Sequence, residues 1–158
     1  MSLLVVNISD MKISTNPEDV IVTYSLGSCL GVTAYDPKKR IGGLIHCLLA
    51  RASTSPKRAQ QNPYMFVNTG VAMMVRKLAM KGADIKRLEF KAAGGANMRN
   101  EDTFLTGQKN YEALLRLMER NEIKLKASDV GGSIPRTIFL HLDTGKVVMK
   151  SLGRMKEL

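Results

Sequence analysis

The 158-residue chain is 44% hydrophobic, which is ordinary for a folded protein and excludes extended disorder, and its length favours a single domain spanning residues 1–158. Its 24 lysines and arginines outnumber 14 acidic residues and give a net charge of +10, but the basic residues are dispersed and not interleaved with aromatic residues, so no nucleic-acid partner is expected. No apolar run reaches the length of a membrane span and no secretory signal is recognisable, so we expect a cytoplasmic protein without membrane insertion.

Four short segments rich in valine, isoleucine and leucine predict β-strands in the first half of the chain. They are Leu3–Ile8, Val20–Thr23, Leu30–Tyr35 and Ile41–Leu49. Between the last two, Asp36 and Pro37 predict a turn, because proline fixes φ and aspartate caps the following backbone. Such a short connection favours an antiparallel hairpin, which brings His46 towards the strand that follows Cys29.

Cys29 and His46 are the candidate catalytic residues. Cys29 ends a Gly-Ser-Cys turn between two predicted strands, where small residues let backbone N–H groups approach a ligand closely. A thiol, a histidine and exposed backbone donors are the components of a cysteine hydrolase. The alternative for a lone cysteine is a small hydrophobic residue of the core.

The second cysteine, Cys47, is not expected to form a disulfide with Cys29 or to complete a zinc site. His46 and Cys47 are neighbours on one predicted strand, so their side chains point to opposite faces. If His46 faces Cys29, then Cys47 faces away from it. Adjacent strand residues rarely bind one metal ion, and no Cys-x-x-Cys pair is present, so neither a metal nor another cofactor is expected.

Two amphipathic helices and four further strands are expected in the rest of the chain. A polar loop over residues 50–61 leads to Asn62 and Pro63, which are typical of a helix start, and Gly82 is typical of a helix end. The other predicted elements are a helix over Gly107–Asn121 and strands over Leu88–Ala93, Lys124–Ser128, Arg136–Leu142 and Lys146–Ser151. This order predicts an α/β layered sandwich, with a mostly antiparallel or mixed β-sheet packed by two main helices.

Four groups of residues resemble motifs of the CheD family of chemoreceptor glutamine deamidases. The resemblance extends over nearly the whole chain and rests on the segments Val22–Cys29, Gly42–Leu49, Gly94–Met98 and Asp129–Gly145. The chain departs from the family pattern at Ser25, where glycine is usual, at Ala50, where proline is common, and in residues 106–110 and 133–135. The Cβ of Ser25 is strained only if φ is positive at that position.

The resemblance implies a triad of Cys29, His46 and Thr23. Cys29 is the nucleophile, His46 acts first as base and then as acid, and Thr23 orients the imidazole. Because Cys29 precedes a predicted strand, no helix N-terminus lowers its pKa, and a facing imidazole is the main route to a thiolate. The backbone N–H groups of Ser28 and Cys29 are the candidates for an oxyanion hole. Without the resemblance, Thr23 is an ordinary β-branched strand residue.

The implied function is conversion of glutamine to glutamate on the cytoplasmic helices of bacterial chemoreceptors, through a thioester on Cys29. Methylglutamate hydrolysis through the same thioester is a second implied reaction. A CheC-type phosphatase is the implied regulator, and the alternative function is a non-enzymatic regulatory module that docks on that phosphatase or on a receptor. Lys57 and Arg58 are candidates for a basic rim that attracts acidic receptor helices, with solvated loop charges as the alternative.

Overall fold

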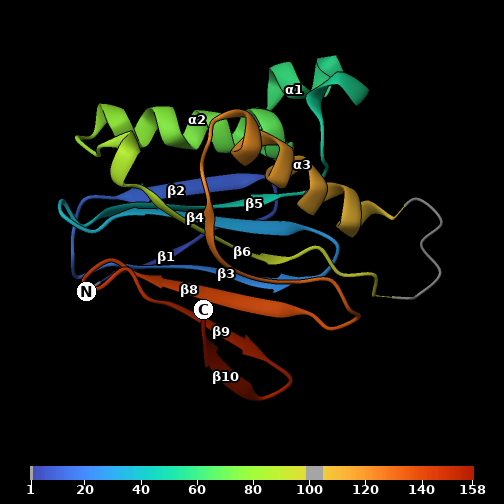
Figure 1. Ribbon diagram of the computed structural model, residues 1–158. Coiled ribbons are helices and arrows are strands. Elements are labelled where there is room, and N and C mark those ends of the chain that lie inside the picture. The colour runs from blue at the N-terminus through green and yellow to red at the C-terminus, as the bar shows by residue number, and fades with distance from the viewer. Residues whose placement is uncertain (1, 99–104) are drawn as a thin grey trace.

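The computed structural model describes residues 2–98 and 105–158, which form three layers (Figure 1). Two β-sheets are stacked face to face, and the main helices cover the free face of one of them. The predicted α/β layered architecture is confirmed. The strands are divided between two mixed sheets, whereas the sequence pattern indicated only one.

The sheet that lies away from the helices, here called the outer sheet, has five strands. Their spatial order is β1 (Leu3–Val5), β3 (Val20–Leu26), β8 (Arg136–His141), β9 (Val147–Ser151) and β10 (Arg154–Glu157). β1 and β3 run parallel, and the other neighbours are antiparallel. β8 and β9 are joined by the turn that the sequence predicts around Gly145.

The middle layer, here called the inner sheet, also has five strands. Their order is β2 (Asp10–Ser14), β5 (Ile41–Cys47), β4 (Leu30–Asp36), β6 (Glu89–Gly94) and β7 (Leu125–Val130). Every residue of β4 and β5 is buried. Because both faces of these strands are covered, their sequences are mostly apolar and do not alternate regularly with polar residues, and the polar exceptions Thr33, Asp36 and His46 are buried.

The two main helices are α2 (Val67–Met80) and α3 (Thr106–Arg120). Asn62 does act as a cap, because its side chain accepts the Tyr64 N–H, but it begins the 3-10 turn η2 (Pro63–Met65), and α2 begins later than predicted. The polar loop contains η1 (Ala52–Thr54) and the short helix α1 (Pro56–Gln61), and η3 (Ile85–Arg87) precedes β6.

Each interface between layers has its own hydrophobic core. The core between the helices and the inner sheet includes Leu30, Val32, Ile45, Val71, Met74 and Leu114. The core between the two sheets includes Ile21, Leu26, Leu44, Ala93, Ile138 and Leu140. Leu44 and Ile45 are neighbours on β5 and enter different cores, as the alternation of side chains along a strand requires.

Two strands were missed from the sequence, and β1, β5 and β8 end earlier than predicted, at Val5, Cys47 and His141. β2 carries Asp10 and Lys12 among its five residues, and all four residues of β10 are exposed, so neither has a hydrophobic run. β10 is an edge strand, where charged residues protect the open edge from further pairing. β1 ends at Val5, although the hydrophobic pattern continues to Ile8.

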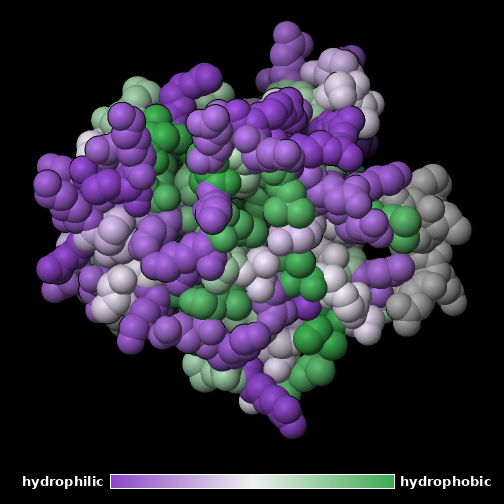
Figure 2. Space-filling view, viewed as in Figure 1, coloured by the Kyte–Doolittle hydropathy of each residue, from purple (hydrophilic) through white to green (hydrophobic). Residues whose placement is uncertain are grey.

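None of the described helices is long and apolar enough to cross a membrane. Hydrophilic residues cover most of the face seen in Figure 2, with hydrophobic residues gathered in patches near its centre.

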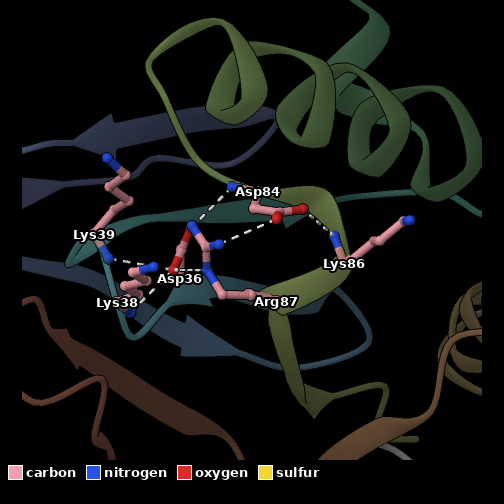
Figure 3. Close-up of polar contacts among 6 residues, drawn as sticks. All are labelled: Asp36, Lys38, Lys39, Asp84, Lys86 and Arg87. Atoms are coloured by element: carbon pink, nitrogen blue, oxygen red, sulfur yellow. Dashed lines mark hydrogen bonds and ion pairs between the residues drawn. The ribbon is translucent and has the colours of Figure 1, made fainter.

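A buried carboxylate fixes the turn between β4 and β5 and ties it to the segment before β6 (Figure 3). The side chain of Asp36 is fully buried and accepts two hydrogen bonds from Arg87, at 3.1 and 2.9 Å. It also accepts the backbone N–H groups of Lys38, Lys39 and Asp84. Burial alone would raise the pKa of Asp36, but these donors hold it well below its usual range.

Removing the Asp36 charge should destabilise the fold. Asp36→Asn keeps the side-chain size but replaces one buried acceptor oxygen with an NH2 donor that faces the N–H groups of Arg87 and the backbone, so we expect the free energy of unfolding in urea at pH 7 to fall by about 1–3 kcal/mol. The matched control is Asp84→Asn, which removes a half-exposed partner of Arg87 and keeps the cap of η3, and should lose less than about 1 kcal/mol.

The pH dependence of this difference has a definite sign. Because the folded pKa of Asp36 is depressed, its contribution is complete above the unfolded value of about 3.9 and is lost as the pH falls through the folded value. The stability difference between wild type and Asp36→Asn should therefore shrink below about pH 4. A difference of the same size at pH 3 and pH 7 would contradict this role.

Candidate active site

The candidate site lies where the chain passes from the outer sheet to the inner sheet. β3 belongs to the outer sheet and β4 to the inner sheet, and residues 27–29, here called the Cys29 turn, connect them. Thr23 comes from β3 and His46 from β5. The three residues of the expected triad therefore come from both sheets and from the connection between them.

A hydrogen bond joins Thr23 and His46 between the two sheets. The Thr23 Oγ1 lies 2.7 Å from His46 Nδ1 and 2.8 Å from the carbonyl oxygen of Val6. A carbonyl oxygen can only accept, so the single Thr23 hydroxyl proton is donated to Val6. Thr23 must then accept from His46 Nδ1–H, which leaves the lone pair of the neutral imidazole on Nε2. This Nε2 is buried and has no hydrogen-bond partner among the described residues.

Cys29 and His46 lie on the same face of the inner sheet. Gly31 is paired with His46 across β4 and β5, and Cys29 precedes Gly31 by two residues, so strand alternation places both on one side. A Cβ at Gly31 would lie 2.8 Å from Leu26, so this side faces the outer sheet. Cys47 packs in the core on the helix side, and both cysteines are free thiols.

Burial keeps the thiol and the imidazole neutral near pH 7. His46 is 2% exposed, and burial lowers the pKa of its imidazole to about 4. Cys29 is 9% exposed, and burial raises the pKa of its thiol, although the hydrogen bond from its own backbone N–H partly opposes this. The resting site therefore contains a neutral thiol and a neutral base, and not an ion pair.

A glycine turn packs against the Cys29 turn. The Gly95 N–H donates to the Cys29 carbonyl at 2.8 Å, and the Ala96 N–H donates to the Gly27 carbonyl at 2.9 Å. Gly94 has a φ of +109°, and a Cβ there would collide with the Cys29 carbonyl oxygen, so this approach requires glycine. These contacts fix the backbone around Cys29.

Two buried side chains near the turn had no role in the sequence analysis. Asn110 of α3 donates to the carbonyls of Ser28 and Leu48 at 2.9 and 3.1 Å. Arg136 of β8 donates to the Gly94 carbonyl at 3.3 Å. The sequence signals for Asn110 are a polar residue on the apolar face of a predicted helix and its place in the segment 106–110, which is a variant of a family motif; its partners are far away along the chain.

Ser25 lies at a β-bulge beside the site. The register of β3 against β8 shifts between Thr23 and Leu26, and Ser25 has a φ of +54°. The strain expected for a positive φ is therefore present, and amounts to about 1 kcal/mol relative to glycine. Its backbone N–H donates to Thr137 Oγ1 at 3.1 Å, which helps to hold the bulge.

A cavity of about 580 Å³ lies between residues 49–54 and α3. Asn110, which donates to the Ser28 carbonyl, forms part of its wall, but no residue of the Cys29 turn is among the described lining residues. The basic residues of its lining are Arg51, Lys109 and Arg116. Lys57 and Arg58 lie on α1, where both are exposed. The described residues contain no cluster of three or more metal-binding side chains.

Iodoacetamide should alkylate Cys29 far faster than Cys47, which is fully buried in the folded protein. Because burial raises the pKa of Cys29, its thiolate increases with pH, and the rate should still be rising above the usual thiol value of about 8.5. His46→Ala should slow the labelling at neutral pH, because the neighbouring base is lost. Peptide mass spectrometry after short exposures measures both sites. Equal labelling of the two thiols, or an unchanged rate in His46→Ala, would contradict this arrangement.

The sequence comparisons identify the relatives of the chain. The family model described as "CheD chemotactic sensory transduction" matches residues 48–151. A protein named "Probable chemoreceptor glutamine deamidase CheD" from Solibacter usitatus is 38% identical, over 100% of this chain and 94% of that protein. Proteins of the same name from Thermococcus kodakarensis and Pyrococcus horikoshii are 39% and 40% identical, over 87% of this chain and 86% and 85% of their own lengths. This chain belongs to the CheD family.

Proposed function

We propose that the protein is a cytoplasmic glutamine deamidase that converts glutamine to glutamate on bacterial chemoreceptors, with Cys29 as nucleophile. The observation that carries this proposal is the direction of the hydrogen bond between His46 and Thr23. Because His46 Nδ1–H donates to Thr23, His46 Nε2 is an unpaired basic nitrogen on the same face of the inner sheet as Cys29. The relatives are named probable chemoreceptor glutamine deamidases, and these names support the choice of substrate.

In the first half of the reaction, His46 Nε2 takes the thiol proton while the sulfur of Cys29 attacks the carboxamide carbon of the substrate. A C–S bond forms, and the carbonyl electrons move onto oxygen. The N–H groups of Ser28 and Cys29 stabilise this oxyanion; in the described part of the chain neither donates to another residue. The C–N bond then breaks, and His46 returns its proton to the departing ammonia.

In the second half, water hydrolyses the thioester. His46 takes a proton from the water, the hydroxide adds to the thioester carbon, the C–S bond breaks and the sulfur regains a proton. The products are glutamate and free Cys29. A methylglutamate side chain would enter the same path with methanol as the leaving group, so we propose ester hydrolysis as a second reaction.

The charge states support activity near neutral pH. With its pKa lowered to about 4, His46 is an unprotonated base well below pH 7. The thiol of Cys29 does not need to be deprotonated in the resting enzyme, because His46 removes its proton during the attack. Activity should therefore be retained in mildly acidic solution and be lost as the pH falls towards 4, where His46 becomes protonated.

We also propose that charge guides the protein to its substrate. The net charge of +10 attracts acidic helices and increases the rate of association at low salt. Lys57 and Arg58 on the exposed helix α1 are the proposed rim residues, and the basic residues around the cavity extend the same field. A CheC-type phosphatase is the proposed regulatory partner, for which the support is the family membership.

The direct test is the intact mass of a receptor cytoplasmic fragment after incubation with the protein. Each deamidation replaces NH2 by OH and adds about one mass unit, which peptide mapping then assigns to a glutamine. Cys29→Ser and His46→Ala should abolish the change, because one lacks the nucleophile and the other lacks the base. If Cys29→Ser leaves the mass change intact, the triad is wrong; if wild type modifies nothing but still binds receptor, the protein is a binding module.

The charge proposal is tested in the same assay with the double variant Lys57→Glu and Arg58→Glu. Its receptor deamidation at low salt should fall severalfold, while alkylation of Cys29 stays unchanged, because association and chemistry are separate steps. If the double variant deamidates the receptor at low salt as fast as wild type does, Lys57 and Arg58 do not guide the substrate.

A further inference from the structure

The candidate oxyanion donors, the N–H groups of Ser28 and Cys29, belong to peptide groups whose carbonyl oxygens accept hydrogen bonds from other parts of the chain. A peptide group is planar and trans, so its C=O and N–H point in opposite directions. The Ser28 N–H shares a peptide group with the Gly27 carbonyl, which the Ala96 N–H holds at 2.9 Å. The Cys29 N–H shares one with the Ser28 carbonyl, which the Asn110 side chain holds at 2.9 Å. One donor is thus oriented by a backbone contact and the other by a side chain.

The orientation of the Asn110 amide is determined by its two contacts. Its NH2 group donates to the Ser28 carbonyl and, at 3.1 Å, to the Leu48 carbonyl. Rotating the amide would place Oδ1 against two carbonyl oxygens, so only this orientation is favourable. Asn110 has no exposed surface, and its Oδ1 is buried without a partner in the described structure. Leaving that oxygen unpaired costs stability, which indicates that the two donated bonds matter.

We propose that Asn110 is a positioning residue that aims the Cys29 backbone N–H at the oxyanion of the reaction. This inference rests on the proposed function, since it assigns Asn110 a role in the same acyl transfer. By holding the Ser28 carbonyl from behind, Asn110 fixes the tilt of the Ser28–Cys29 peptide. A hydrogen bond to a carbonyl also polarises the peptide group and strengthens its N–H as a donor. α3 thereby contributes to the site without contacting the substrate.

This role separates two reactions of the same sulfur. Acylation by an ester or an amide passes through a tetrahedral oxyanion and needs the aimed N–H groups. Alkylation by iodoacetamide displaces iodide at a saturated carbon and forms no oxyanion. A loss of oxyanion stabilisation therefore slows acylation and spares alkylation, whereas a general disturbance of the Cys29 turn or of His46 slows both.

The test uses Asn110→Leu and Asn110→Asp in the full chain. Both variants approximate the size of asparagine and lack its NH2 donors. p-Nitrophenyl acetate is the acylating probe: the sulfur of Cys29 bonds to the acetyl carbon, p-nitrophenolate leaves, and His46 takes the thiol proton. Acetylation and carbamidomethylation of Cys29 are followed by peptide mass spectrometry, with Cys29→Ser as the blank. Cys47 reports folding, because it is fully buried and reacts only when the core opens.

We expect acetylation of Cys29 to fall between about 10- and 100-fold in both variants, with alkylation changed less than about twofold. The matched control, Asn121→Leu, removes an asparagine at the end of α3 whose side chain donates to the Leu117 carbonyl, far from the Cys29 turn, and should change neither rate. Receptor deamidation should fall in kcat, with KM unchanged, because the substrate surface is intact.

Two outcomes would overturn the inference: unchanged acetylation in a variant that keeps Cys47 protected, or acetylation and alkylation that fall together. If Cys47 becomes reactive in one variant, that variant is unfolded, and the rates measured in the other variant are used for the test. Failure of the proposed function would give a different result: the wild-type protein would acetylate Cys29 rapidly but would deamidate no receptor glutamine.

Discussion

The Thr23 hydroxyl has one proton, and the chemistry of the site depends on where that proton goes. Because it is donated to the Val6 carbonyl, Thr23 can only accept from His46, and the imidazole must present an unprotonated Nε2. Val6 follows β1 and Thr23 lies in β3, so the outer sheet sets the tautomer of a histidine in the inner sheet. The stacking of two sheets is therefore a requirement of the site and not only a way of burying hydrophobic surface.

The same arrangement has a cost in stability. His46 Nε2 and Asn110 Oδ1 are buried without partners in the described chain, and each such group costs about 1–3 kcal/mol. Ser25 adds strain at a bulge next to the site. Two continuous hydrophobic cores offset these costs from either side of the inner sheet. Unpaired buried atoms are not confined to this turn, because Asp19 Oδ1 also lacks a partner among the described residues, whereas the buried carboxylate of Asp36 is fully paired.

Local patterns in the sequence predicted most of the elements, because β4, β5, α2 and α3 each bury a continuous or periodic hydrophobic surface. The division into two sheets could not be predicted, since hydrophobic residues do not reveal which of two cores they enter. The proximity of Cys29 and His46 could be predicted, because a short hairpin connects the strands that position them. The position of Asn110 could not be predicted, because its contact with Ser28 joins residues 82 positions apart and depends on how α3 packs on the inner sheet. The resemblance to a family supplied Thr23, whose residue type alone indicates only a strand.

The most direct test of this account is the protonation of His46, measured by nitrogen-15 NMR of the imidazole at pH 7. The chain has two histidines, so the His141→Gln variant assigns the signals. The structure requires a neutral ring with the proton on Nδ1 and a free lone pair on Nε2, persisting in mildly acidic solution because burial lowers the pKa to about 4. In Thr23→Val the preference for Nδ1–H should be lost. A ring protonated on Nε2, or an imidazolium at pH 7, would contradict the central claim that Thr23 and Val6 orient His46 as the base for Cys29.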